Sequence, residues 1–267
     1  MAKTIGIINQ KGGVGKTTIA NALSYVYASM GLKTLLIDFD PQASQSIMVN
    51  LDSAEYRNSD HDIIKIFSKE NPTPIKIKSD LELYIIPSNI GLSKQAENSM
   101  QGKDKMLEMY VKRVASQFDV ILIDGNPSFS SLMTNVILAS NILLVPVVTS
   151  AIDEAGTKGF VDIIEDACDT YEKKLDLVGV LPSKFNKRRN DDRDVLAILE
   201  NELPKYISSL KLLKNYPLVI FEPIPEKAVF KDAAAARMFV GEYIALYSKH
   251  NAETTMLLEK IAKKLIA

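Results

Sequence analysis

Short, mostly apolar runs recur along the chain and alternate with longer segments in which apolar residues return every three or four positions. A short apolar run bounded by polar or turn residues predicts a buried β-strand, and the three-to-four spacing predicts an amphipathic helix. The predicted strands are residues 5–8, 34–37, 81–86, 120–123, 142–148, 177–181 and 218–221. The predicted helices are residues 16–30, 103–117, 130–139, 154–173, 191–202 and 241–266.

This alternation predicts an α/β fold with a mainly parallel, twisted sheet and helices on both faces. No linker rich in Gly, Ser or Pro interrupts the pattern, so we expect a single domain over residues 1–267. Residues 52–80 are polar and poorly patterned. In such sheets the ligand binds at the carboxyl ends of the strands. Segments 9–18, 38–46 and 124–128 lie at those ends and carry polar and turn residues.

The segment Asn9–Thr18 (NQKGGVGKTT) joins the first predicted strand to the first predicted helix and has the composition of a phosphate-binding loop. Glycines allow backbone N–H groups to face phosphate oxygens, and a helix N-terminus adds partial positive charge. The pattern predicts that Lys16 contacts the β- and γ-phosphates, Thr17 ligates Mg²⁺ and Thr18 contacts the α-phosphate. We therefore expect ATP or ADP with Mg²⁺ as ligands. The residues predicted to hold the nucleotide here are Lys11, Gly12, Gly13, Val14, Gly15, Lys16, Thr17 and Thr18.

Carboxylates follow two of the apolar strands. Asp38 and Asp40 come after the run 34–37, and Asp124 follows the run 120–123. A nucleotide site needs a carboxylate to order Mg²⁺ and the attacking water, although two acids at a strand end could also be a solvated terminus. The run 120–123 fits a Walker B strand, whose terminal acid contacts Mg²⁺, usually through water. We expect Asp124 to have that role.

Composition excludes several other kinds of site. The formal net charge is −1, so binding to nucleic acid would need a local basic patch. Cys168 is the single cysteine, which excludes an intrachain disulfide and a cysteine metal cluster. It lies at helical spacing and is predicted to be a small core residue. The start of the chain lacks the long apolar stretch of a signal peptide, so we expect a cytoplasmic protein.

The phosphate loop departs from its usual pattern, because Gln10 stands where a glycine is usual and a second lysine, Lys11, opens the loop. This deviant Walker motif resembles that of the ParA/MinD group of P-loop NTPases. The segment Asp38–Gln42 (DFDPQ) resembles the first switch of ParA proteins, and the resemblance to ParA/Soj-type partition ATPases extends over nearly the whole chain. It implies that Lys11 reaches across a dimer to the partner's nucleotide. It also implies that Asp40 positions the hydrolytic water and contacts the metal shell, while Asp38 supports the loop.

The second switch differs from the ParA pattern. Relatives usually continue the Walker B strand with Thr-Pro-Pro-Ser, whereas this chain has Gly125, Asn126, Pro127 and Ser128. We expect the change to leave metal binding by Asp124 intact. We expect Gly125 to loosen the switch, and Asn126 has an amide that could hydrogen-bond the γ-phosphate or water.

The far part of the chain resembles the segments of ParA proteins that approach the base and the DNA. Leu177–Lys187 and Phe221–Pro225 resemble the adenine pocket, although a strand end and a Pro-rich turn would look the same. The resemblance implies base contacts from Lys184, Phe185, Asn186 and Pro225. Relatives often have Arg where this chain has Glu226. Basic residues nearby could instead bind DNA phosphates without base readout, or form an ordinary solvated face. The DNA-contact residues expected are Lys187, Arg188, Arg189, Lys227 and Lys231, with Arg193 and Arg237 beside them.

The resemblance implies an ATPase that forms an ATP-dependent homodimer, binds nucleoid DNA nonspecifically and segregates plasmids or chromosomes with a centromere-binding, ParB-like adaptor. An alternative is a MinD-like membrane-cycling ATPase, because residues 255–266 form a basic amphipathic helix. We expect that helix to pack on the core instead, and no membrane partner. An electron-transfer ATPase like nitrogenase iron protein would need cluster cysteines that the chain lacks.

Overall fold

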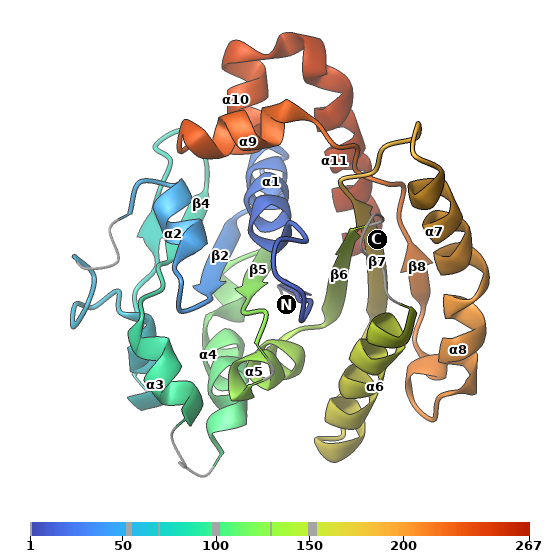
Figure 1. Ribbon diagram of the computed structural model, residues 1–267. Coiled ribbons are helices and arrows are strands. Elements are labelled where there is room, and N and C mark those ends of the chain that lie inside the picture. Colours follow the sequence, from blue (N-terminus) through green and yellow to red (C-terminus); the bar gives the residue numbers. More distant parts are fainter. Residues whose placement is uncertain (1, 52–54, 69, 98–101, 129, 149–153) are drawn as a thin grey trace.

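The computed structural model describes residues 2–51, 55–68, 70–97, 102–128, 130–148 and 154–267. In this part of the chain, eight strands form one sheet in the order β3-β4-β2-β5-β1-β6-β7-β8 (Figure 1). All neighbouring strands are parallel except β3, which pairs antiparallel with β4. The strands are β1 Lys3–Ile7, β2 Thr34–Phe39, β3 Ile75–Lys76, β4 Leu83–Ile86, β5 Val120–Gly125, β6 Ile142–Val148, β7 Leu177–Ser183 and β8 Leu218–Ile220. The mainly parallel sheet predicted from the sequence is confirmed.

Helices cover both faces of the sheet, as predicted. On one face α1, α9, α10 and α11 pack on side chains such as Ile5, Leu36 and Leu122. On the other face α4, α5, α6 and α8 pack on the alternate positions, such as Ile121, Leu143 and Val178 (Figure 1). The α-helices described are α1 Lys16–Ser29, α2 Ser44–Met48, α3 Gly91–Glu97, α4 Met106–Val114, α5 Ser131–Ala139, α6 Glu154–Thr170, α7 Asn190–Asn201, α8 Leu203–Ser209, α9 Ala228–Ala235, α10 Val240–Tyr247 and α11 Ala252–Ile266.

Several predicted helices are divided in the structure. The helix expected over 103–117 is α4 with a short 3₁₀ turn at each end. The helical end of the chain is split into α10 and α11 by a 3₁₀ turn at Lys249–Asn251. Four short helices among the described residues were not predicted, namely α2, α3, α8 and α9. The α8 helix begins directly after α7 because Pro204 occupies its first turn, where a missing N–H costs no helical hydrogen bond.

The last helix packs on the protein's own core. Leu258, Ile261 and Leu265 of α11 are buried, and the Tyr27 hydroxyl of α1 donates to the Ala262 carbonyl oxygen at 2.9 Å. The expectation that this helix covers the core is confirmed. Among the described helices, none is long and apolar enough to cross a membrane.

The strand register brings the chemically loaded segments together. β1 and β2 both pair with β5, and Asp38 lies opposite Asp124 across the β2–β5 pair. Because the three strands are parallel, their carboxyl ends meet at one edge of the sheet. The phosphate loop after β1 and the acids at the ends of β2 and β5 therefore share one site.

Candidate functional site

The phosphate loop connects β1 to α1 in the conformation that glycine permits. Gly13 and Gly15 have φ values of +72° and +95°, in the left-handed region that other residues rarely adopt. Gly15 occupies the N-cap of α1 and, having no side chain, makes no side-chain cap hydrogen bond to the first turn. The N–H groups in the first turn of a helix have no acceptor within the helix, and a phosphate can accept hydrogen bonds from them. The loop is thus arranged to hold an anion at the start of α1.

Side chains from the neighbouring strand ends hold this loop in place. The Asn9 amide donates to the Pro146 carbonyl oxygen at 2.7 Å, while its oxygen accepts from the Lys11 N–H at 2.9 Å. The Ser183 hydroxyl, at the end of β7, donates to the Val14 carbonyl oxygen at 2.8 Å. Asn9 and Ser183 have no place among the predicted site residues, because only the strand order brings β6 and β7 beside the loop.

Two lysines contact the loop itself. Lys16 is 7% exposed, and its ammonium donates to the Lys11 carbonyl oxygen at 3.2 Å. Burial lowers the pKa of Lys16, while the nearby Asp124 and Asp40 carboxylates act in the opposite direction. The Lys184 ammonium donates to the Gly13 carbonyl oxygen at 2.7 Å. Two positive groups therefore lie against the first half of the loop.

Asp38 is buried and hydrogen-bonded. Its carboxylate accepts from the Ser46 N–H at 2.8 Å, the Ser46 hydroxyl at 2.7 Å and the Asp40 N–H at 3.3 Å. Burial raises the pKa of Asp38 to about 7, and the bonds from Ser46 partly offset that rise. This geometry matches the supporting role expected of Asp38 rather than direct contact with a ligand.

Asp124 is equally buried but lacks such partners. It is 1% exposed, and neither carboxylate oxygen accepts a hydrogen bond of normal geometry from the described residues. Burial, and then the charge of Asp38, raise the pKa of Asp124 well above its usual range, while the Thr17 hydroxyl lowers it. A buried carboxylate without partners is costly, and a cation would satisfy it. The site therefore fits a magnesium ion beside Thr17 and Asp124.

The protein alone supplies too few ligands for that ion. Within the described ranges, no group of three or more His, Cys, Asp and Glu side chains is placed to hold a metal. Mg²⁺ usually completes its shell with water and substrate phosphates. Asp40 is half-buried, lines the adjoining pocket, and its Oδ1 accepts from the Gln42 N–H at 3.0 Å. The arrangement suits a metal that arrives with a nucleotide.

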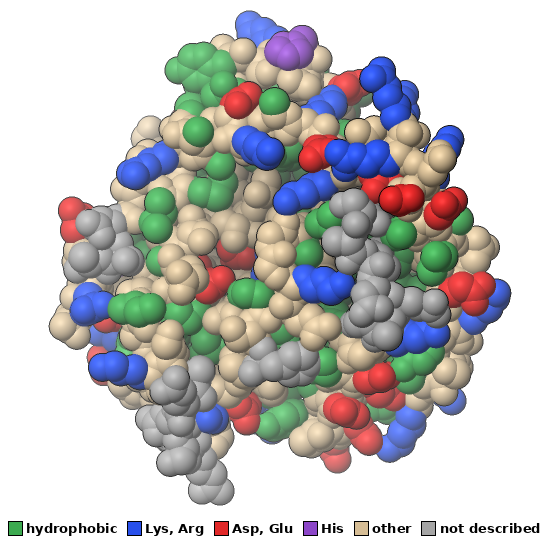
Figure 2. Space-filling view, viewed as in Figure 1, with side chains coloured by type: hydrophobic (Ala, Val, Ile, Leu, Met, Phe, Trp, Pro, Cys, Tyr) green, Lys and Arg blue, Asp and Glu red, His purple; other side chains and the backbone are tan. Residues whose placement is uncertain are grey.

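A pocket of about 510 Å³ opens from the phosphate loop toward α9. Figure 2 shows this face of the molecule hollowed at its centre. Lys184 and Pro225, both predicted base contacts, line the pocket, as do Phe230 and Lys231 of α9, of which only Lys231 was predicted to belong to a site. Apolar groups are also contributed by Met48 and Leu258. An apolar chamber beside a phosphate loop has the form that a nucleobase requires.

Phe185 and Asn186 have a different place from the one expected. Within the described residues neither lines the pocket. The Phe185 N–H donates to the Ile224 carbonyl oxygen at 3.0 Å, and its carbonyl oxygen accepts from the Glu226 N–H at 3.0 Å. The Asn186 N–H donates to the Asp192 carboxylate at 2.6 Å. The two residues connect the loop after β7 to the segment that carries Pro225. They therefore support the residues that line the pocket and do not line it themselves.

The predicted basic patch is divided by ion pairs. Arg189 pairs with Glu226 at 2.9 Å, and Lys227 pairs with Glu253. Lys187, Arg188 and Lys231 are exposed. Figure 2 shows Lys and Arg side chains on both sides of the hollow, with acidic side chains between them.

Gly125 is held more firmly than expected. It is the last residue of β5 and pairs with Phe39 of β2. A Cβ atom at this position would lie 2.9 Å from the Ile7 carbonyl oxygen. The expectation that Gly125 loosens the second switch is therefore wrong, because glycine allows β5 to run close to β1. The neighbouring Asn126 accepts from the Ser128 N–H at 2.6 Å and so stabilises its own turn.

Comparison with known proteins identifies relatives of this chain. A family model described as an AAA domain matches residues 2–177. The sporulation initiation inhibitor protein Soj of Bacillus subtilis is 27% identical over 270 residues, which cover 100% of this chain and 99% of Soj. The cell division protein PomZ of Myxococcus xanthus is 28% identical over 75% of this chain. The match spans 63% of PomZ, less than two thirds of its length.

A solved structure has a similar fold. Cobyrinic acid a,c-diamide synthase from Mycobacterium smegmatis, with bound ADP and magnesium, has a TM-score of 0.72 and 25% sequence identity. The similarity covers 90% of this chain and 93% of the synthase. With its eight-stranded sheet, deviant phosphate loop and acidic strand ends, the chain belongs to this AAA domain family and, within the P-loop ATPases, to the ParA/Soj-type partition ATPases.

Proposed function

We propose that this protein is a single-domain, Mg²⁺-dependent ATPase that positions plasmid or chromosomal DNA. It binds ATP in the described pocket, closes into a homodimer, holds DNA nonspecifically and is released when a ParB-like adaptor stimulates hydrolysis. The observation that carries the proposal is the meeting of three features at one edge of the sheet: the N-terminus of α1 without a side-chain cap, the buried Lys16, and Asp124, which accepts no hydrogen bond of normal geometry from the described residues. We expect the protein to act in the cytoplasm on the nucleoid.

The residues of the pocket have separate roles in this proposal. The loop N–H groups, Lys16 and Thr18 bind the phosphates, and Lys16 neutralises charge that develops as the γ-phosphate leaves. Asp40 orients the attacking water. Mg²⁺, held by Thr17 and by Asp124 through water, would neutralise the phosphates when bound. Because phosphoryl transfer needs position and charge more than covalent chemistry, this set of residues is sufficient for hydrolysis.

Lys11 is proposed to act in the partner subunit's site. The loop around it is accessible, because Gly12 and Gly13 are exposed and no described atom lies within 4 Å of a Cβ built on either. Such an open backbone leaves room for a second subunit to approach. The similarity to Soj over the full chain length supports a dimer.

The test separates nucleotide binding from dimerisation. Lys11→Ala should keep ADP affinity within about twofold while losing the ATP-dependent dimer and most hydrolysis, because its target lies on the other subunit. Lys3→Ala is the matched control, since Lys3 lies at the opposite end of β1 in a surface pair with Asp176. Sedimentation with ATP and phosphate release measure the two properties. A Lys11→Ala protein with normal dimerisation and hydrolysis would refute this part.

The proposed DNA surface rests on the exposed cations near the pocket. Lys187, Arg188 and Lys231 would neutralise phosphates and make binding salt-sensitive. Retention of random DNA should require ATP and weaken as salt rises. A triple alanine variant at these positions should bind less tightly and show a smaller salt slope, whereas Lys112→Ala, in an exposed pair on α4, should not. No ATP-dependent retention at low salt would refute DNA transport.

The structure favours DNA over a membrane as the surface on which the protein cycles. The apolar stripe of α11 is used in packing on α1, so little of it remains to enter a lipid surface. Co-sedimentation with anionic liposomes in the presence of ATP tests this point. Binding to liposomes but not to DNA would support a MinD-like cycle instead.

A further inference from the structure

A ring of hydrogen bonds surrounds the backbone of Asp40. The Ser88 hydroxyl donates to the Asp40 carbonyl oxygen at 2.7 Å, and the Ser88 N–H donates to the Ser46 hydroxyl oxygen at 3.0 Å. Ser46 donates in turn to Asp38, which accepts the Asp40 N–H. The Asp40 carbonyl oxygen also accepts from the Ala43 N–H at 2.9 Å, so both backbone groups of Asp40 are held. Ser88, the second residue after β4, closes the ring.

This ring determines where the Asp40 carboxylate can lie. Ser46 and Asp38 are fully buried and Ser88 is 1% exposed, so water cannot readily replace their bonds. Asp40 itself is half-buried and lines the pocket. With its N–H and carbonyl oxygen held, the backbone of Asp40 cannot rotate without breaking at least one of these part-buried hydrogen bonds. The hydroxyl of Ser88 therefore acts on the site through Asp40.

Asn89, the residue after Ser88, connects this ring of hydrogen bonds to a segment distant in the sequence. We call residues 55–68 and 70–74, between α2 and β3, the β2–β4 excursion. The Asn89 amide donates to the Asp62 carboxylate of the excursion at 2.7 Å, and its oxygen accepts from the Gly91 N–H at 2.9 Å. Both Asn89 and Asp62 are buried, at 3% and 4% exposure. Gly91 packs closely against the Asn89 side chain, because a Cβ on Gly91 would lie 2.7 Å from the Asn89 side-chain oxygen.

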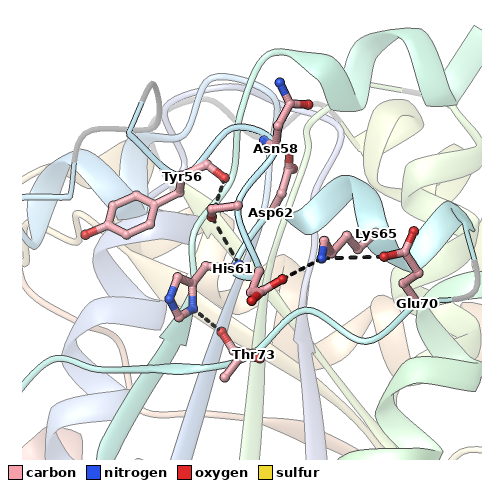
Figure 3. Close-up of polar contacts among 9 residues, drawn as sticks. Tyr56, Asn58, His61, Asp62, Lys65, Glu70 and Thr73 are labelled. Atoms are coloured by element: carbon pink, nitrogen blue, oxygen red, sulfur yellow. Dashed lines mark hydrogen bonds and ion pairs between the residues drawn. The ribbon is translucent and has the colours of Figure 1, made fainter.

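The excursion is a defined structure and can serve as an anchor. Asp62 accepts from the Asn58 N–H at 2.7 Å and the Ile64 N–H at 3.0 Å. Figure 3 shows the turns around it, in which His61 donates to the Thr73 carbonyl oxygen at 2.7 Å. A buried carboxylate that accepts several hydrogen bonds resists displacement. Asn89 is therefore held from the excursion side, and Ser88 is held with it.

We propose that Ser88 is a positioning residue for hydrolysis, which sets the backbone of Asp40, and that the Asn89–Asp62 pair anchors Ser88. The inference rests on the proposed function, since it requires Asp40 to orient the attacking water. Such a residue affects the rate of the chemical step and not the binding of nucleotide, because the phosphate loop lies on β1 and α1 and shares none of these bonds.

The experiment compares two variants of Ser88 with a matched control. Ser88→Ala removes the hydroxyl and Ser88→Thr keeps it. Ser140→Ala removes a fully buried hydroxyl that donates to the Val136 carbonyl oxygen at 2.6 Å, at the opposite edge of the sheet. For Ser88→Ala we expect kcat to fall about tenfold, the factor that corresponds to the net free energy of one hydrogen bond. KM for ATP and affinity for a fluorescent ADP analogue should stay within about twofold. Ser88→Thr should recover at least part of kcat, and Ser140→Ala should leave it unchanged.

Double variants test the connections. Asp40→Ala should remove the effect of Ser88→Ala, because the hydroxyl acts through that residue. Asn89→Ala should lower kcat about threefold and should not add to the effect of Ser88→Ala. Additive losses would overturn the anchoring, and equal losses in Ser88→Ala and Ser140→Ala would show a general effect of stability and overturn the positioning role.

The two proposals fail in different ways. A wild-type protein that hydrolyses ATP, with Asp40→Ala inactive and Ser88→Ala unchanged, overturns the role of Ser88 alone. A wild-type protein that releases no phosphate from ATP above the background rate refutes the proposed ATPase activity and takes the role of Ser88 with it.

Discussion

Replacing Asp124 by Asn should stabilise the nucleotide-free protein while removing its response to magnesium. The carboxylate is buried at the end of β5, neither oxygen has a hydrogen-bond partner among the described residues, and Asp38 lies opposite. An unsatisfied buried polar group costs about 1–3 kcal/mol. Asn removes the charge, and its amide can donate to neighbouring acids, so we expect a gain of about 2 kcal/mol. For a chain of this size that is a rise in melting temperature of about 4–8 °C.

The response to ligand should change in the opposite direction. A ligand at one hundred times its Kd adds about 2.7 kcal/mol, a rise of about 5–10 °C. In wild type this rise should be larger for ADP with Mg²⁺ than for ADP with a chelator. In Asp124→Asn the two should be equal, because the phosphate loop is intact and the metal site is lost.

Thermal melts at neutral pH with ADP, with or without Mg²⁺, measure both effects. Asp176→Asn is the control, since that acid lies in an exposed pair with Lys3 and should change the melting temperature little. A destabilised Asp124→Asn protein, or one that keeps the magnesium-dependent shift, would refute the assignment of Asp124 to the magnesium site.

Three further predictions concern the loop, the core and the last helix. Gly15→Ala and Gly102→Ala, both at positive φ and without a steric clash for the added Cβ, should each lose about 1 kcal/mol, but only Gly15→Ala should weaken ADP binding in a titration. Burial raises the pKa of Cys168 to about 11, above its usual value of about 8.5. The folded protein therefore retains the proton longer than the unfolded chain, and the unfolding free energy should fall by about 2 kcal/mol from pH 8 to pH 10. Urea titrations would detect this, and an equal slope in Cys168→Ala would contradict it. Leu258→Ala, fully buried in α11, should cost about 2–5 kcal/mol, against less than about 0.5 for the 69%-exposed Met256→Ala. Equal costs in chemical denaturation would mean that α11 does not pack as described.

Local chemistry was sufficient to predict the main elements of the fold and the phosphate loop. Buried parallel strands such as β2 and β5 are continuous apolar runs, so their existence follows from composition over a few residues. The segment before β4 could not be predicted in the same way. β3 has only two residues, and a strand this short gains its hydrogen bonds from β4 and not from its own pattern.

The chain order of strands, the glycine-lysine-threonine loop and the acids at the ends of β2 and β5 were determined by the sequence itself, because each depends on neighbouring residues. Only the tertiary structure decided which residues support them. Ser183 donates to Val14 across 169 positions, and Ser88 reaches Asp40 across 48. Such bonds depend on strand order and register, which arise when the whole sheet packs. For the same reason Asp38 and Asp124, alike in sequence as acids after apolar strands, differ in the fold: packing gives hydrogen-bond donors to one and leaves the other without a partner among the described residues.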